Sequence, residues 1–173
     1  MYADDTSIIV TSPNLETLQE QNDKIFQDVN KWFKVNQLAL NYNKTQYLQF
    51  NTKNSMDYTL KLNFKGNYVK NSPQTKFLGL TIDDTLSWKA HIDHIMSKLN
   101  TACFVVRMIQ PIMSSETLRM VYFAYVHPIL SFGIIFWGNQ PHGEKIFKKQ
   151  KGAVRIITHS KMSDSCRELF KRL

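Results

Sequence analysis

The chain has 173 residues, of which 43% are hydrophobic and 21% are charged, and it contains six glycines and five prolines. This composition is typical of one folded domain or two small ones, and it excludes a fibrous or wholly disordered chain. The longest apolar run, residues 129–137, is about half of a membrane span. The two cysteines lie far apart and lack metal-site spacing, which favours a reducing compartment over a disulfide scaffold.

The formal net charge of +8 is distributed unevenly along the chain. Residues 1–50 carry four lysines against six acidic groups, whereas residues 142–173 carry nine basic and three acidic groups. Carboxylates hold metal ions and lysines bind phosphates, so an acidic beginning and a basic end are typical of an enzyme that acts on nucleic acid. A solvated helix face explains the same basic excess without any ligand.

The first half of the chain predicts short strands around one helix. Residues 6–10 are β-branched and apolar, which predicts a buried strand. Apolar residues then recur at helical spacing from Leu15 to Phe33, after the possible N-cap Ser12 and before Asn36. Further short strands are expected around residues 38–40, 48–50, 60–64 and 77–82.

From about Trp88 the spacing of the apolar residues changes to that of helices. A long amphipathic helix is expected up to Val106, and a second one from about Ser114, interrupted at Pro128. Residues 129–137 are too apolar to be expected at the surface. A basic helix and a short final helix follow, the basic one with these residues on or near one face: Ile146, Phe147, Val154 and Ile157.

The candidate chemistry lies in residues 1–5, Met-Tyr-Ala-Asp-Asp, directly before the predicted strand. Successive side chains of a strand point to opposite faces, so only a turn presents Asp4 and Asp5 together. Mg²⁺ prefers carboxylate oxygens, and two such ions about 3.5–4 Å apart can activate a hydroxyl and stabilise a leaving pyrophosphate. A bare pair of aspartates is also typical of an acidic surface turn, but the flanking residues favour a metal site.

Residues 2–5 resemble the YxDD signature of reverse transcriptases, in the YADD form common in non-LTR retrotransposons. Residues 32–50 resemble the family's next motif, W-x3-N-x-L-x-LN-x2-KT-x4-F, and residues 77–92 resemble the FLG motif that follows. The resemblance is to jockey-like or related LINE elements, and it covers essentially the whole chain. Its later matches are Tyr122, Pro128, Leu130, Gly133, Trp137, Gly138, Gln150, Ala153, Arg155, Ile156, Cys166, Leu169 and Phe170.

The resemblance implies an α+β fold. Residues 1–86 would form a partial polymerase palm of antiparallel strands with one helix, and residues 87–173 an all-helical thumb-like region. Asp4 would be a metal ligand, Asp5 a second ligand or supporting carboxylate, and Tyr2 would lie near the primer terminus. Lys44 would protonate or neutralise the leaving pyrophosphate, where negative charge develops. A solvated turn lysine is the alternative for Lys44.

Two further segments would contact the primer and template. Phe77, Leu78 and Gly79 would form the primer grip, with the glycine allowing close approach of a nucleic-acid strand. A buried strand with a bulge is the alternative, and both can hold at once. On the basis of charge, five residues of the basic helix would contact the template–primer backbone: Lys145, Lys148, Lys149, Lys151 and Arg155.

Other candidate residues favour structural roles. The pair Asp83-Asp84 precedes a helix, which predicts capping or turn formation rather than metal binding. His91 and His94 are three residues apart, but no third ligand is evident except Asp93, which points elsewhere around the helix. These residues are therefore expected to serve at the surface or at a helix cap.

The resulting prediction is part of an RNA-directed DNA polymerase of a mobile element. Its cofactor would be Mg²⁺ or Mn²⁺, and its partners an RNA template, a DNA primer, deoxynucleoside triphosphates and the N-terminal part of the polymerase, in the nucleus or cytoplasm and without a membrane. In the family a second aspartate motif and the fingers lie upstream, so these 173 residues alone are predicted to be inactive. The alternatives are a non-catalytic nucleic-acid-binding remnant and a non-functional truncated copy of an element.

Overall fold

In a computed structural model of the chain, residues 6–50, 60–64 and 66–173 are described. The chain divides between Thr75 and Lys76 into two compact units. Within the described residues, strands occur up to Asp83 and helices alone follow. The expected α+β class is therefore confirmed, with a helical second half. The assignment of the two parts to a palm and a thumb stays a prediction.

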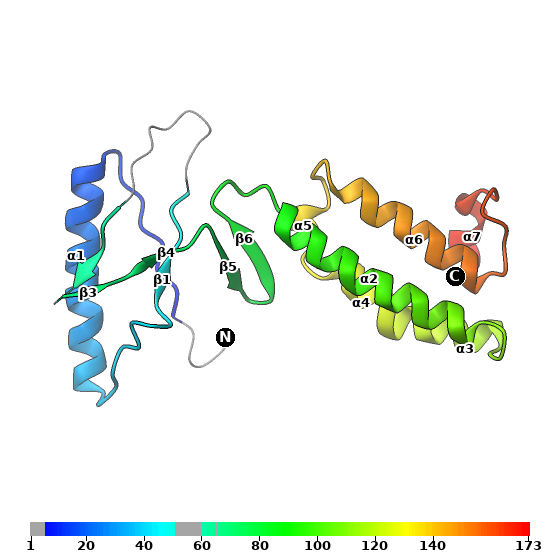
Figure 1. The fold of residues 1–173 in the computed structure, drawn as a ribbon, viewed down its shortest axis with the longest axis horizontal. Helices are drawn as coiled ribbons and strands as arrows, with labels where there is room; N and C mark the ends of the chain where they lie inside the picture. Colours follow the sequence, from blue (N-terminus) through cyan, green and yellow to red (C-terminus); the bar gives the residue numbers. More distant parts are fainter. Residues whose placement is uncertain (1–5, 51–59, 65) are drawn as a thin grey trace. The chain divides into compact units, whose positions relative to one another are not determined.

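The first unit is built around α1, which spans Leu15–Val35 and runs beside the short strands (Figure 1). Its N-cap is Asn14, whose side-chain oxygen accepts the backbone N–H of Thr17 at 2.9 Å. The helix therefore begins slightly later than Ser12 predicts. It ends at the C-cap Asn36, as expected.

The strands of the first unit are only two residues long. β1 (Gln46–Tyr47) pairs in parallel with β4 (Lys70–Asn71), and β2 (Asn63–Phe64) pairs antiparallel with β3 (Asn67–Tyr68). The expected antiparallel arrangement therefore holds for β2 and β3, whereas β1 and β4 depart from it.

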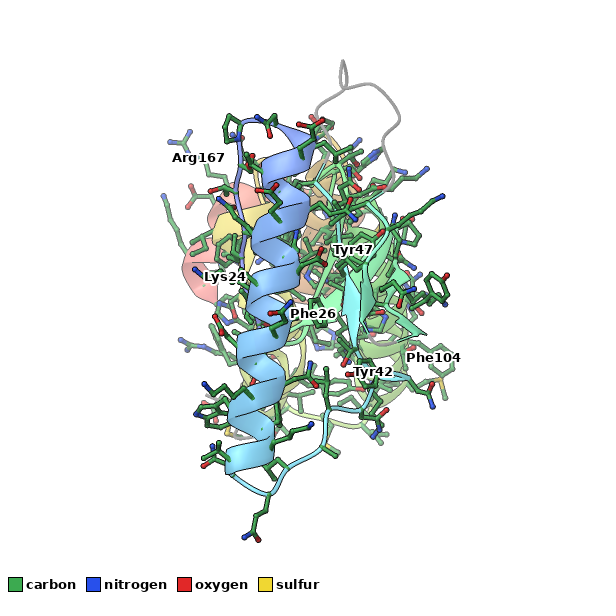
Figure 2. All side chains as sticks on the ribbon, turned by 90° about the vertical axis from the view of Figure 1, so that its left-hand side faces the viewer. Lys24, Phe26, Tyr42, Tyr47, Phe104 and Arg167 are labelled. Carbon is green, nitrogen blue, oxygen red and sulfur yellow. The ribbon has the colours of Figure 1, made fainter. Side chains whose placement is uncertain are left out.

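A small apolar cluster holds α1 against these strands. Figure 2 shows Phe26 of α1 and Tyr47 of β1 within this layer. No residue of α1 is fully buried, and Trp32 is 59% exposed. Helices in proteins are stabilised mainly by packing of an apolar face. Packing within its own unit therefore contributes little to the stability of α1. The buried members of the cluster are Leu60, Leu62 and Val69.

Residues 6–10 do not form the predicted strand. Ile8 is 50% exposed and Ile9 is 88% exposed. A strand requires a hydrogen-bonded neighbour, and no described strand pairs with this segment. The β-branched residues favour an extended backbone, but this preference does not provide a neighbouring strand to pair with. The predicted strand is therefore wrong for these residues.

A hairpin replaces the single strand predicted over residues 77–82. β5 (Gln74–Phe77) and β6 (Leu80–Asp83) are joined by Leu78 and Gly79, whose φ angles are +47° and +84°. Positive φ at both central residues is what a type I′ hairpin turn requires. The Leu-Gly pair in the middle of an apolar run therefore marks a turn.

The second unit contains α2 (Lys89–Ile109) lying alongside α6 (Gly143–Ile157) (Figure 1). Between them come α3 (Ser115–Val121), the π-helical turn η1 (Tyr122–Val126), α4 (His127–Ser131) and α5 (Ile134–Trp137). The short α7 (Cys166–Arg172) packs on α6.

The interruption expected at Pro128 takes the form of η1 followed by α4. A proline lacks the N–H needed for the helical hydrogen bond and crowds the preceding turn, and a π-helical turn accommodates both effects. The Ser114 N-cap of α3 agrees with its predicted start, since its hydroxyl accepts the N–H of Thr117 at 3.3 Å.

The core of the second unit lies on the inner face of α2, as the spacing predicts. Trp137 is 2% exposed, and its indole N–H donates to the carbonyl of Phe132 at 3.0 Å. The fully buried members of this core are Ile92, Leu99, Ala102, Val106, Leu118, Val126, Ala153 and Val154.

The apolar run 129–137 is buried only in part. Leu130 and Trp137 lie in the core, whereas Ile135 is 84% exposed and Phe136 is 53% exposed. The segment folds into two helices of four or five residues, and each turns one side inward. The expectation that the whole run is buried is therefore wrong, because helical segments of this length cannot bury successive residues.

Candidate nucleic-acid interface

The predicted metal ligands lie outside the described residues. This holds for Asp4 and Asp5 and for the neighbouring Tyr2. Within the described ranges, no group of three or more histidine, cysteine, aspartate or glutamate side chains could hold a metal ion. The aspartate pair therefore stays a prediction of the sequence.

Lys44 lies in a turn whose geometry is set by Asn41. The Asn41 side-chain oxygen accepts the N–H of Asn43 at 3.1 Å and that of Lys44 at 3.3 Å. Next to this turn, the hydroxyl of Tyr42 donates to the side-chain oxygen of Asn30 on α1 at 3.2 Å. The Lys44 side chain is exposed and forms no ion pair with the other described residues. A fixed backbone therefore presents a free ammonium just before β1.

The Phe77-Leu78-Gly79 segment has a structural explanation of its own. A Cβ atom on Gly79 would come within 3.1 Å of the Phe132 ring, and its φ of +84° is unfavourable for other residues. On the opposite side of this contact, Gly133 also has a positive φ, and a Cβ there would lie 2.6 Å from a methyl of Leu80. Gly79 therefore permits a turn that packs under the ring of Phe132. A primer grip at this turn is untested and stays a prediction.

The cations of α6 are distributed over two faces. Lys148, Lys151 and Arg155 follow at intervals of three and four residues, which places them in one row along the helix. Lys145 and Lys149 lie beside this row. Lys148 is 3.9 Å from the carboxylate of Glu144, but both side chains are more than 70% exposed, so this pair neutralises little of the charge.

Lys149 is a half-buried cation of α6. Its charge acts on the thiol of Cys103 in α2, where burial raises the pKa and the nearby Lys149 and Arg107 lower it in part. The net effect raises the pKa, so the thiol stays protonated and unreactive near neutral pH.

An open pocket with a volume of about 500 Å³ lies between α6 and α7. Arg155 lines it, and its Nε and Nη2 atoms donate to the backbone carbonyl of Asp164 at 3.1 and 2.9 Å. Phe147 also lines it and is 50% exposed, although its spacing predicts a position on or near the core face. The aromatic and basic side chains of α6 and α7 thus meet in one place. Sequence reasoning missed Phe147, Arg167 and Phe170 as site residues.

Asp83 forms the turn that leads into α2, which is one of the two roles predicted for it. Its carboxylate accepts the N–H of Trp88 at 3.2 Å and the hydroxyls of Thr85 and Ser87. Burial by itself raises the pKa of Asp83, and these hydrogen bonds more than offset that and lower it. The carboxylate therefore stays ionised at the start of α2.

His91 is buried rather than at the surface or a helix cap, so the expectation for this residue is wrong. The side chain is 2% exposed, and its Nδ1 accepts the N–H of Thr81 at 3.2 Å. Its Nε2 has no hydrogen-bond partner among the described residues. The ring lies between Trp88 and Trp137, with ring centroids 6.1 and 6.3 Å away. His91 therefore joins β6 to α2.

Several residues that carry the family resemblance form the core of the second unit. Gln150 donates to the hydroxyl of Tyr122 at 2.9 Å, which links α6 to η1. Trp137, Cys166 and Leu169 are buried. These motif positions therefore specify the packing of the helices, which suits a helical region that supports a binding surface.

The chain thus has an α+β fold, and its C-terminal helices carry an excess of positive charge around an open pocket. The chain is similar to a probable RNA-directed DNA polymerase from transposon BS of Drosophila melanogaster, with 26% identity over 162 residues, which cover 91% of this chain. The chain spans 18% of that relative's length. No protein-family model and no solved structure matches it. None of the described helices is long and apolar enough to cross a membrane.

The resemblance to a transposon reverse transcriptase, which the motifs predict, is confirmed by this match. Along nearly its whole length, the chain resembles a polymerase that the relative's name attributes to a transposon.

Proposed function

We propose that the chain is part of an RNA-directed DNA polymerase of a non-LTR mobile element. The observation that carries the proposal is the similarity over 91% of the chain to a transposon polymerase, together with the ordered motifs from Tyr2 to Phe170. The reaction is nucleotidyl transfer with two divalent metal ions, for which Asp4 and Asp5 supply carboxylate ligands in the complete enzyme. Lys44 neutralises charge on the leaving pyrophosphate.

The helical unit binds the template–primer backbone in this proposal. The row of Lys148, Lys151 and Arg155 on α6 supports this, because its cations make no ion pair among the described residues beyond the long contact from Lys148 to Glu144. Cations of this kind bind phosphates and release counterions, so the affinity must fall as salt is added. Lys145 and Lys148 are the most suitable residues for a test, because both are exposed and neither belongs to the core.

The test measures the affinity of the 173-residue chain for a labelled RNA–DNA primer–template at increasing salt concentration. The logarithm of the binding constant should fall linearly with the logarithm of salt concentration. The double variant Lys145→Gln/Lys148→Gln should reduce the slope by about two, one for each phosphate that a lysine no longer binds. A matched double variant on α1, Lys24→Gln/Lys31→Gln, removes two exposed lysines and should leave the slope unchanged.

Two outcomes oppose this part of the proposal. One is the absence of binding to the primer–template. The other is an unchanged slope in the α6 variant, which would show that these lysines do not contact phosphates.

A further inference from the structure

The pocket between α6 and α7 combines a flat aromatic surface with several cations. Its volume of about 500 Å³ is within the usual range for small-ligand sites. Three cations, Lys151, Arg155 and Arg167, line it together with one carboxylate, that of Asp164. The pocket therefore carries an excess of positive charge beside an aromatic surface.

The aromatic surface comes from Phe147 and Phe170. Their rings are nearly parallel, with an interplanar angle of 10° and centroids 6.2 Å apart. Phe147 remains 50% exposed. A phenylalanine that served only the core would be largely buried, whereas a half-exposed ring offers a face on which a nucleic-acid base can stack.

The cations around these rings differ in how firmly they are held. Arg155 is fixed by two hydrogen bonds to the Asp164 carbonyl, which leave three of its five N–H groups for a ligand. Arg167 is exposed. The Lys151 ammonium lies 4.4 Å from the centre of the Phe147 ring. Such a contact is weak at an exposed site, so a base can take its place while the ammonium moves to a phosphate.

We infer that this pocket binds an unpaired nucleotide of a single-stranded nucleic acid. The base stacks on Phe147, and the flanking phosphates lie at Arg155, Arg167 and Lys151. Bases in a duplex are stacked on their neighbours and offer no free face, so the ligand is a single strand rather than a duplex. The inference rests on the proposed function, which makes nucleic acid the ligand, and adds the site that receives an unpaired part of it.

The test measures fluorescence anisotropy of a short labelled oligouridylate with the 173-residue chain. Phe147→Leu keeps an apolar side chain but removes the ring, and it should weaken binding by about tenfold. Phe147→Tyr keeps the ring and should bind like the wild type. Arg167→Gln should weaken binding and reduce the salt slope by about one, whereas the matched change Arg172→Gln, outside the pocket on the same helix, should not.

Thermal unfolding of each variant, followed by circular dichroism, checks that the helices remain folded. An oligothymidylate of equal length tests whether the strand must be RNA. Equal affinity would show that the pocket accepts single-stranded DNA as well as single-stranded RNA. Competition by free uridine monophosphate at the same concentration as the oligonucleotide would overturn the inference, because it would show a mononucleotide site.

The remaining outcomes separate this inference from the proposed function. If Phe147→Leu and Arg167→Gln bind the single strand like the wild type, while the α6 lysine variant still weakens primer–template binding, the pocket inference is wrong and the proposed function stands. If the wild-type chain binds neither ligand, the pocket inference and the proposed contact with template and primer are both wrong.

Discussion

The buried ring of His91 is expected to make the helical unit less stable as the pH falls. The Nδ1 atom accepts the N–H of Thr81, and a nitrogen that accepts a hydrogen bond carries no proton. Burial lowers the pKa of His91, and the nearby charges of His94 and Lys98 lower it further. The ring is therefore neutral in the folded chain over a range of pH in which an exposed histidine is charged.

The direction and size of the effect follow from proton binding. In the unfolded chain His91 titrates at about 6.5, so below that pH the unfolded state binds a proton that the folded state does not. The contribution to stability is fully present above this pH and decreases as the pH falls toward the lowered pKa of the folded state. One group can contribute at most about 1.4 kcal/mol per pH unit.

The assay is urea unfolding followed by tryptophan fluorescence at several pH values between 5 and 8, an interval of about 1.5 units on either side of the unfolded pKa. Trp88 and Trp137 lie beside the ring and report on its surroundings. His91→Asn supplies a neutral acceptor for Thr81. It should be less stable than the wild type at neutral pH, because ring volume is lost, but its stability should depend less on pH.

The matched control is His94→Asn, which removes an exposed histidine of the same helix. Burial, the largest cause of the lowered pKa of His91, remains in this variant, so most of the wild-type pH dependence should persist. The reasoning is refuted if the unfolding free energy of the wild type and that of His91→Asn change equally between neutral and acidic pH.

Three further changes test the packing of the hairpin, the stability of α6 and the turn before α2. Gly133→Ala should destabilise the chain by about 1–3 kcal/mol, because its φ is +63° and its Cβ would clash with Leu80, whereas Gly152→Ala, with nothing within 4 Å of its Cβ, should stabilise α6 by up to about 1 kcal/mol. Thermal unfolding that ranks these two variants in the opposite order would contradict the described contacts. Asp83→Ala removes the carboxylate that holds the N–H of Trp88 and should cost about 1–2 kcal/mol, measured by urea unfolding. An unchanged midpoint would show that this hydrogen-bonded turn before α2 does not stabilise the chain.

Local sequence patterns predicted much of the helical unit. The inner face of α2, the Ser114 cap and the interruption at Pro128 follow from apolar spacing, hydrogen-bonding side chains and the missing proline N–H. These features depend on residues close together in the chain, which is why the sequence indicates them. The start of α1 differs because Asn14 and Ser12 are both good caps. The backbone N–H of Thr17 donates to Asn14, whereas Ser12 bonds only the Thr17 hydroxyl.

Features that depend on distant residues were not predictable in the same way. Residues 6–10 have the composition of a strand, but pairing depends on a partner. The burial of His91 depends on Thr81 and on Trp137, which lies in another helix. Phe147 has the spacing of a core residue, yet the loop before α7 and the ring of Phe170 leave it at a pocket. The motif residues therefore indicated the resemblance to transposon polymerases more reliably than they indicated where the side chains lie in the fold.

The most direct test of the proposed function is a competition between nucleic acids for the chain at physiological salt concentration. A labelled RNA–DNA primer–template with a single-stranded RNA overhang is bound first, and unlabelled competitors are added at equal concentration of anionic groups. Unlabelled primer–template should displace the label at a lower concentration than blunt double-stranded DNA or heparin does. Equal displacement by heparin, or no binding of the primer–template at all, would contradict the claim that this chain contacts the template and primer of an RNA-directed DNA polymerase.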